Sequence, residues 1–241
     1  MTRSLEGRTV FVTGANGGLG THFVKQALAR GAVKVYAAAR TPQQWGDVRI
    51  VPVELDITNG EHIARAAAAA SDVDLVVNNA AIAPAGDLIM GPQDALRRIF
   101  ETNFFGNLAV ANAFAPVLGK NGGGTLLNIL SVAAWISVPT GYAASKAAMW
   151  SATNALRAAL QGQRTQVVGL LVGMIDTPMT ARWDFPKVSP ESVVDKAYDG
   201  IAAGLIEILA DDFTQDLKTR LSTKAEEFYP WIHEQLAGFE P

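Results

Sequence analysis

The chain has 241 residues, of which 49% are hydrophobic and 18% charged, and its net charge is −3. This size fits one large domain over residues 1–241 whose core needs no disulfide or metal, and the absence of cysteine excludes disulfide and thiolate chemistry. Lysine and arginine are scattered, so a nucleic-acid partner is not expected. The start carries no apolar signal core and no run reaches the length of a spanning helix, so we expect no membrane partner and a cytoplasmic location.

Apolar runs of strand length alternate with segments of helical periodicity along the whole chain. The expected strands cover residues 9–12, 33–39, 50–55, 74–78, 125–130, 166–172 and 207–209. The expected helices cover residues 21–30, 60–70, 92–118, 141–160, a helix that begins at Pro190, and 213–236 with an interruption at Pro230. This alternation predicts an α/β fold, a doubly wound parallel sheet of about seven strands with helices on both faces.

A glycine-rich turn, residues 13–20, joins the first strand to the first helix. Glycine permits close backbone approach, and a helix N-terminus offers unpaired N–H groups and partial positive charge to a phosphate. The turn therefore predicts a pyrophosphate site made by Gly14, Asn16, Gly17, Gly18, Leu19 and Gly20. Such a turn can also serve tight packing alone, so other residues must decide between the two interpretations.

Tyr142 and Lys146 stand four residues apart near the start of an expected helix, hence on one face. A phenol titrates near pH 10, and a nearby ammonium lowers that pKa toward the range useful for proton transfer. By itself the spacing also fits a surface tyrosine beside an unrelated lysine. Ser131 ends a strand eleven residues earlier, where a loop can bring its hydroxyl beside the phenol.

Together with Asp56, Asn78-Asn79-Ala80, Asn103, Gly173 and Thr177, these residues resemble the short-chain dehydrogenase/reductase family over roughly residues 7–210. The resemblance implies an NAD(P)-dependent oxidoreductase that acts on a carbonyl or an alcohol. It makes Tyr142 the proton donor to the substrate oxygen, Ser131 the residue that holds this oxygen, and Lys146 the group that lowers the pKa of Tyr142 and binds the nicotinamide ribose.

The same resemblance implies that Asn103 interrupts the long helix at 92–118 and holds a water linked to Lys146. Further cofactor contacts are expected after the strands, at Asp56, Ile57, Asn79, Ala80, Gly173, Ile175 and Thr177, and near the start of the helix at 141–160, at Tyr142 and Lys146.

The end of the second strand bears on the choice of cofactor. A ribose 2′-hydroxyl is typically held by an acidic residue about 20 positions beyond the glycines, whereas a 2′-phosphate requires a cation. Here Arg40 occupies that region and no carboxylate follows until Asp47, which favours NADP(H) and leaves NAD(H) possible. Arg40 stacked on adenine, or merely solvated, is the alternative.

Two departures from the family pattern affect the site. The family's usual Asn-Asn-Ala-Gly is Asn78-Asn79-Ala80-Ala81 in this chain. The final alanine adds a methyl group near the cofactor. The usual Pro-Gly after the sixth strand is Val172-Gly173, which is expected to loosen that turn.

An apolar substrate pocket is expected from side chains in the segments after the fifth and sixth strands, namely Ala133, Trp135, Val138, Met174, Met179 and Trp183. It would suit a ketone, aldehyde or secondary alcohol with hydrophobic substituents, although some of these side chains could simply complete the core. His22, His62 and His233 are isolated and lack metal-ligand spacing, so no metal is expected.

The main prediction is thus an NADP(H)-dependent carbonyl reductase or alcohol dehydrogenase. The alternatives are an NADP-binding sensor or scaffold protein without turnover, an NAD-dependent alcohol dehydrogenase of the same fold, and a sugar-nucleotide epimerase or dehydratase, which normally has a larger C-terminal region. The small and apolar residues of the helices at 92–118 and 141–160 predict a homodimer or homotetramer.

Overall fold

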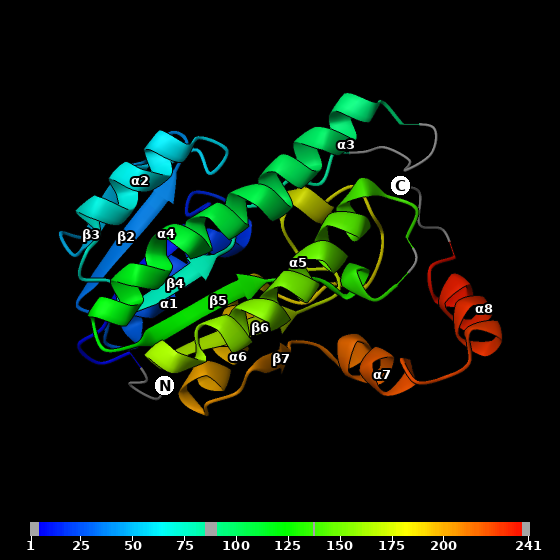
Figure 1. The fold of residues 1–241 in the computed structure, drawn as a ribbon. Helices are drawn as coiled ribbons and strands as arrows, with labels where there is room; N and C mark the ends of the chain where they lie inside the picture. The colour runs from blue at the N-terminus through cyan, green and yellow to red at the C-terminus, as the bar shows by residue number, and fades with distance from the viewer. Residues whose placement is uncertain (1–4, 85–90, 137, 238–241) are drawn as a thin grey trace.

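The central sheet is entirely parallel, and the prediction of a doubly wound α/β fold is confirmed. The computed structural model describes residues 5–84, 91–136 and 138–237, so the first and last four residues of the predicted domain lie outside the description. Within these ranges seven strands lie in the order β3-β2-β1-β4-β5-β6-β7 (Figure 1). Their bounds are β1 (Thr9–Thr13), β2 (Lys34–Ala39), β3 (Ile50–Glu54), β4 (Leu75–Asn78), β5 (Gly124–Ile129), β6 (Thr165–Leu171) and β7 (Glu207–Leu209).

Helices cover both faces of the sheet. They are α1 (Gly18–Ala29), α2 (Gly60–Ala69), α3 (Gln93–Phe100), α4 (Asn107–Lys120), α5 (Gly141–Ala159), α6 (Pro190–Ala202), α7 (Asp212–Arg220) and α8 (Ala225–Gln235). Successive strand side chains point to opposite faces, so Val10 and Val12 pack with α1 and α6, while Phe11 packs with α2 and α4. Both faces of the central strands are therefore buried, as their nearly continuous apolar sequences predict.

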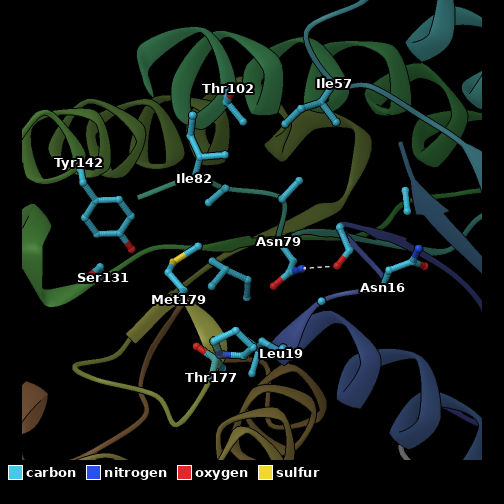
Figure 2. Close-up of a pocket in the computed structure, with 18 of the residues that line it drawn as sticks. Asn16, Leu19, Ile57, Asn79, Ile82, Thr102, Ser131, Tyr142, Thr177 and Met179 are labelled. Carbon is cyan, nitrogen blue, oxygen red and sulfur yellow. Dashed lines mark hydrogen bonds between the residues drawn. The ribbon is translucent and has the colours of Figure 1, made fainter. Parts of the chain in front are cut away.

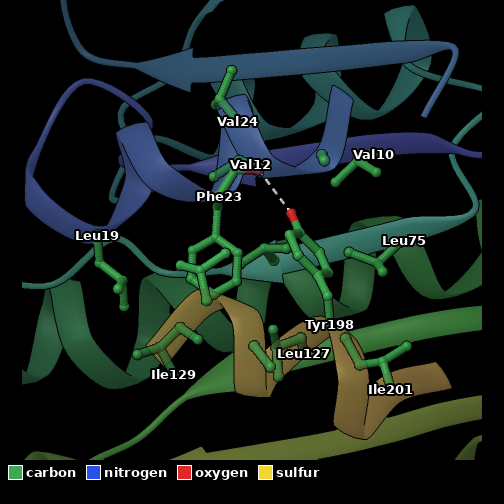
Figure 3. Close-up of a cluster of buried hydrophobic side chains, with 14 of the residues drawn as sticks. Val10, Val12, Leu19, Phe23, Val24, Leu75, Leu127, Ile129, Tyr198 and Ile201 are labelled. Carbon is green, nitrogen blue, oxygen red and sulfur yellow. Dashed lines mark hydrogen bonds between the residues drawn. The ribbon is translucent and has the colours of Figure 1, made fainter. Parts of the chain in front are cut away.

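The core on the α1 side fixes the helix that follows the glycine turn. Phe23 of α1 and Tyr198 of α6 meet edge to face with ring centroids 5.5 Å apart, and the Tyr198 hydroxyl donates a hydrogen bond of 2.8 Å to the Phe23 carbonyl (Figure 3). At the other end of α1, the buried Arg30 guanidinium donates to Asp195 at 2.6 Å. These contacts hold α1 against the sheet, and its N-terminus is thereby fixed beside the end of β1.

Two helix predictions differ from the structure. The helix expected at 92–118 is continuous in direction, but its centre is a π-helical segment, Glu101–Gly106, between α3 and α4. The helix expected at 213–236 is two helices, and the break falls between α7 and α8, not at Pro230. Pro230 lies inside α8 and has no N–H to donate to the carbonyl of Glu226, four residues earlier. Glu226 is an exposed residue of the first turn, where water can bond this carbonyl instead.

Candidate active site

The strand order reverses between β1 and β4, and the crevice at the carboxyl ends of such strands is where ligands bind in this architecture. A cavity of about 900 Å³ lies there. It extends from the glycine turn at the start of α1 to Tyr142 at the start of α5 (Figure 2).

The glycine turn, residues 13–20, requires glycine for steric reasons. Gly14 and Gly18 have φ of 65° and 30°, and a Cβ atom on Gly20 would lie 2.1 Å from the Gly14 carbonyl oxygen. Helix α1 starts within this turn, at Gly18 and not at Thr21, and its N-cap Gly17 has no side chain that could bond the first N–H groups. The turn therefore presents free helix N–H groups to the cavity, which fits the pyrophosphate of a dinucleotide.

Asn79 joins this turn to the end of β4. Its Nδ2 donates to the carbonyl oxygen of Thr13 at 2.9 Å and to that of Gly14 at 3.2 Å, the second of which is drawn in Figure 2. The Thr13 hydroxyl oxygen accepts in return from the backbone N–H groups of Asn79 and Ala80, both at 3.0 Å. These hydrogen bonds, together with one of 3.3 Å from the Thr13 hydroxyl to the Val77 carbonyl, tie together the two strand ends on either side of the crevice.

The ends of β2 and β3 form a polar corner of the cavity. Arg40 is exposed at its edge, and Asn16 Nδ2 donates to the Thr41 carbonyl at 2.6 Å, which draws the glycine turn to this corner. Asp56 accepts from the backbone N–H and the hydroxyl of Thr58, at 2.9 and 2.7 Å. These bonds, with a smaller contribution from the nearby Arg40 cation, lower the pKa of Asp56.

At the opposite end of the cavity the Tyr142 hydroxyl points toward Ser131 (Figure 2). Thr140 caps α5 through a 3.2 Å hydrogen bond from Ala143 N, and this places Tyr142 in the first turn of the helix. Lys146 follows one turn later, with its Nζ 5.6 Å from the Tyr142 ring centroid.

Burial dominates the titration of this pair. The pKa of Tyr142 is raised to about 12 because burial disfavours the phenolate, an effect that a hydrogen bond with Ser131 partly opposes. Burial lowers the pKa of Lys146 to about 8, and its Nζ donates to the Ile129 carbonyl at 2.7 Å. In the protein without cofactor, burial thus shifts the pKa of Tyr142 in the direction opposite to the lowering expected from Lys146.

Asn103 lies in the π-helical segment and does not line the cavity; its side chain is fully buried behind it. Its amide exchanges hydrogen bonds of 2.9 Å with both backbone groups of Ile82, a residue that lines the cavity, and donates to Ser145 Oγ at 3.1 Å. The Ser145 hydroxyl donates in turn to the Tyr142 carbonyl at 2.7 Å. Asn103 thus links the segment after β4 to the first turn of α5.

The predicted cofactor contacts come together in this cavity with one exception. Those that line it are Gly14, Asn16, Gly17, Gly18, Leu19, Arg40, Asp56, Ile57, Asn79, Ala80, Tyr142, Lys146, Gly173, Ile175 and Thr177. Gly20 does not line it, because its position faces the Gly14 backbone inside the turn. Of the predicted catalytic residues, Ser131, Tyr142 and Lys146 line the cavity.

The residues expected to form the substrate pocket lie in different places in the structure. Met179 lines the cavity, but Ala133, Met174 and Trp183 are absent from its lining among the described residues. Trp135 and Val138 pack instead against side chains of α7 and α8. The reason is that this C-terminal helix pair offers them an apolar surface, which the alternation of the sequence did not reveal.

Several residues that line the cavity were not predicted as site residues from the sequence. Ile82 and Thr102 border it from the segments after β4 and α3 (Figure 2), and Arg98 and Glu101 lie in the same wall. Asn107 is buried nearby, and its Nδ2 donates to the Ala80 carbonyl at 3.0 Å. Asn107 stands four residues after Asn103, and Ile82 stands three residues after Asn79, but neither spacing indicates that these residues share one wall.

The fold and the cavity define a dinucleotide-binding α/β protein with a tyrosine, a serine and a lysine at one end of the crevice. The family model described as short chain dehydrogenase matches residues 8–186. The chain therefore belongs to the short-chain dehydrogenase family, and it is an oxidoreductase of that family.

Individual relatives agree with this assignment. A short-chain dehydrogenase from Burkholderia cenocepacia J2315, solved in complex with NADP, is 36% identical and superimposes with a TM-score of 0.88 over 98% of this chain and 99% of that chain. An uncharacterized oxidoreductase of Myxococcus xanthus is 32% identical over 83% of this chain and 86% of its own length. The 1-deoxy-11-beta-hydroxypentalenate dehydrogenase of Streptomyces exfoliatus is 28% identical over 98% of this chain and 93% of its own length.

Two negative findings concern the described residues alone. Their histidine, aspartate and glutamate side chains form no group of three or more that could hold a metal ion. None of their helices has both the length and the apolar character required to cross a membrane.

Proposed function

We propose that this protein is an NADP(H)-dependent oxidoreductase that reduces a ketone or aldehyde with hydrophobic substituents, or oxidises the corresponding secondary alcohol. The observation that supports this most is that one cavity has the glycine turn at one end and Tyr142, Ser131 and Lys146 at the other. A dinucleotide laid along such a cavity has its pyrophosphate at the helix N-terminus and its reactive ring beside the tyrosine.

NADP(H), when bound, supplies the hydride. In the proposed arrangement Arg40 pairs with the 2′-phosphate, Asp56 and Ile57 border the adenine, and the Lys146 ammonium bonds the nicotinamide ribose. The relative from Burkholderia cenocepacia, which was solved with NADP, supports the choice of the phosphorylated cofactor. Met179 and Ile82, which line the cavity near Tyr142, provide apolar surface for the substrate (Figure 2).

Tyr142 is proposed as the general acid of the reduction. A carbonyl oxygen gains negative charge as hydride reaches its carbon, and a positioned donor must neutralise it. With a pKa of about 12 the Tyr142 phenol is protonated at neutral pH and can donate, while the Ser131 hydroxyl orients the same oxygen. Lys146, with a pKa of about 8, is largely charged at neutral pH and stabilises the phenolate left behind.

The test is NADPH oxidation with a panel of aliphatic, cyclic and aryl ketones, with Tyr142→Phe beside the wild type. Removal of the proton donor should lower kcat/KM by about 10²- to 10⁴-fold and leave the Kd for NADPH nearly unchanged. Tyr229→Phe, which changes an exposed tyrosine of α8, is the matched control. Wild-type protein that binds NADPH and reduces no carbonyl would instead support a sensor or scaffold, and turnover with NADH alone would support an NAD-dependent alcohol dehydrogenase.

We also propose that the chain forms a homodimer or homotetramer through α4 and α5. Phe105, at the junction of α3 and α4, leaves 53% of its surface exposed beside Phe104, and burial of this ring in an interface would be favourable. Sedimentation that shows only monomer at micromolar concentration would contradict the proposal. Phe105→Ser should shift the distribution toward smaller species.

A further inference from the structure

A buried carboxylate outside the proposed catalytic group lies behind the wall of the cavity. Asp211, between β7 and α7, has only 7% of its surface exposed. Its Oδ1 accepts from the Thr214 backbone N–H at 2.7 Å, and the Thr214 hydroxyl lies 2.9 Å from both carboxylate oxygens. Its Oδ2 accepts from the backbone N–H of Gly173 at 2.6 Å, and Gly173 lines the cavity.

The peptide group between Val172 and Gly173 is thereby held at both ends. Its N–H donates to Asp211, and its carbonyl oxygen accepts from the backbone N–H of Val132 at 3.0 Å. Val132 directly follows Ser131. A single peptide plane therefore connects the Asp211 carboxylate to the segment that carries the Ser131 hydroxyl.

This peptide begins one wall of the cavity, which continues through Ile175 and Thr177. The wall reaches the glycine turn, since a Cβ atom on Gly18 would lie 3.0 Å from Thr177 Cγ2. Val172 is not a proline, so no ring restrains φ at this position. A hydrogen bond to an ionised acceptor is about twice as strong as a neutral one and can supply that restraint.

We infer that Asp211 is a positioning residue that fixes the Val172–Gly173 peptide and so sets the Gly173–Thr177 wall against the nicotinamide end of NADP(H). The inference rests on the proposed function. The two carboxylate oxygens of Asp211 have different roles. Oδ1 caps α7, and Oδ2 accepts the hydrogen bond from Gly173 at the start of the wall.

Serine is as good an N-cap residue as aspartate but offers one oxygen and no charge. Asp211→Ser therefore keeps the cap of α7 and removes the bond to Gly173. Thr214→Val removes only the hydroxyl that bonds Asp211, and it leaves the backbone cap of α7 and the Gly173 bond in place. Asp212→Ser, at the exposed neighbouring position, controls for the loss of one negative charge.

The first readout needs no catalysis. In ¹H–¹⁵N spectra of the protein without cofactor, the Gly173 amide proton should lie far downfield and exchange slowly in the wild type, in Thr214→Val and in Asp212→Ser. In Asp211→Ser it should move upfield and exchange about tenfold faster or more, since a buried charge-assisted bond is lost. An unchanged Gly173 signal in Asp211→Ser would overturn the inference.

The second readout is the fluorescence of bound NADPH, which reports how firmly the nicotinamide is held. Asp211→Ser should bind NADPH about tenfold more weakly, with a shorter fluorescence lifetime, while Thr214→Val and Asp212→Ser stay within about twofold of the wild type. Equal losses in Asp211→Ser and Thr214→Val would show that the loss follows from any disturbance around Asp211 and not from the Gly173 bond, and would overturn the inference. If Asp211→Ser does not fold, the isosteric Asp211→Asn replaces it, because its amide cannot accept at both oxygen positions.

The proposed function and this inference fail in different ways. Wild-type protein that binds no NADPH refutes the proposed cofactor, whatever the Asp211 variants do. Wild-type protein that binds NADPH, with an Asp211→Ser variant that binds it equally well, refutes the positioning role alone.

Discussion

The glycine turn, residues 13–20, and the Ser131 segment, residues 131–136, line one cavity but keep their shapes by different means. The turn is held by its own glycines and by the adjacent strand end at Asn79. The Ser131 segment packs through Val132 and Ile136 against Leu217 of α7 and residues of α8, at the other end of the chain. The proposed phosphate-binding part of the site thus depends on its own glycines and on one neighbouring strand end, whereas the proposed catalytic part depends on packing against α7 and α8.

The largest effect on NADPH affinity is expected from a substitution in the glycine turn. Gly20→Ala places a Cβ atom against the Gly14 carbonyl, which the Asn79 amide already holds, so the turn must open. Overpacking of this kind costs about 1–3 kcal/mol, and we expect NADPH affinity to fall by at least about 100-fold together with Tm. Isothermal titration and thermal unfolding measure both. Gly60→Ala, with open space around its Cβ, is the control, and unchanged NADPH binding in Gly20→Ala would contradict the local origin of the turn.

The pH dependence of the reaction rates tests the roles proposed for Tyr142 and Lys146. Since the pKa of Tyr142 is about 12, its ionised fraction rises about tenfold per pH unit, and alcohol oxidation should rise accordingly from about pH 6 to 8. Reduction needs the protonated phenol and should stay flat over this range, then fall above about pH 8 as Lys146 loses its charge. Initial rates in both directions give the profiles. An oxidation rate that does not change between pH 6 and 8 would show that Tyr142 is already ionised in the working enzyme.

A substitution of Arg40, at the polar corner of the cavity, should alter the preference between NADPH and NADH without affecting Tyr142 and Lys146. Arg40→Ala removes the cation expected to bind the 2′-phosphate, so the Kd for NADPH should rise about tenfold while the Kd for NADH stays the same. Arg65→Ala removes an exposed arginine of α2 and serves as the control. Equal weakening of NADPH and NADH would show that Arg40 contacts the adenine and not the phosphate.

The smallest effect on activity is expected from a substitution in α8, which packs against the Ser131 segment. Ile232 of α8 is fully buried against the cluster that includes Val132 and Ile136, and Ile232→Ala should destabilise this region by about 2–5 kcal/mol. We expect kcat to fall a few-fold while NADPH affinity stays constant, because α8 lies away from the glycine turn. Glu234→Ala, exposed on the same helix, is the control. A parallel loss of NADPH affinity in Ile232→Ala would show that the two parts of the site are not independent.

Much of the fold followed from patterns of short range. The alternation of apolar strands and amphipathic helices placed every strand within a few residues, and the four-residue spacing of Tyr142 and Lys146 placed both on one face of α5. The terminal helices were less predictable. Pro230 suggested a break, but one exposed carbonyl costs little when Phe228 and Ile232 bury their side chains on either side of it.

The sheet, the glycine turn and the tyrosine–lysine pair could be predicted from the amino-acid sequence, because each depends on backbone geometry or on spacing within one or two neighbouring elements. Three features could be seen only in the folded protein: Trp135 packs beneath α7, burial raises the pKa of Tyr142, and Asp211 accepts a hydrogen bond from Gly173. Packing, desolvation and the pairing of a buried charge are set by residues far apart in the chain, and these become neighbours only when the chain folds.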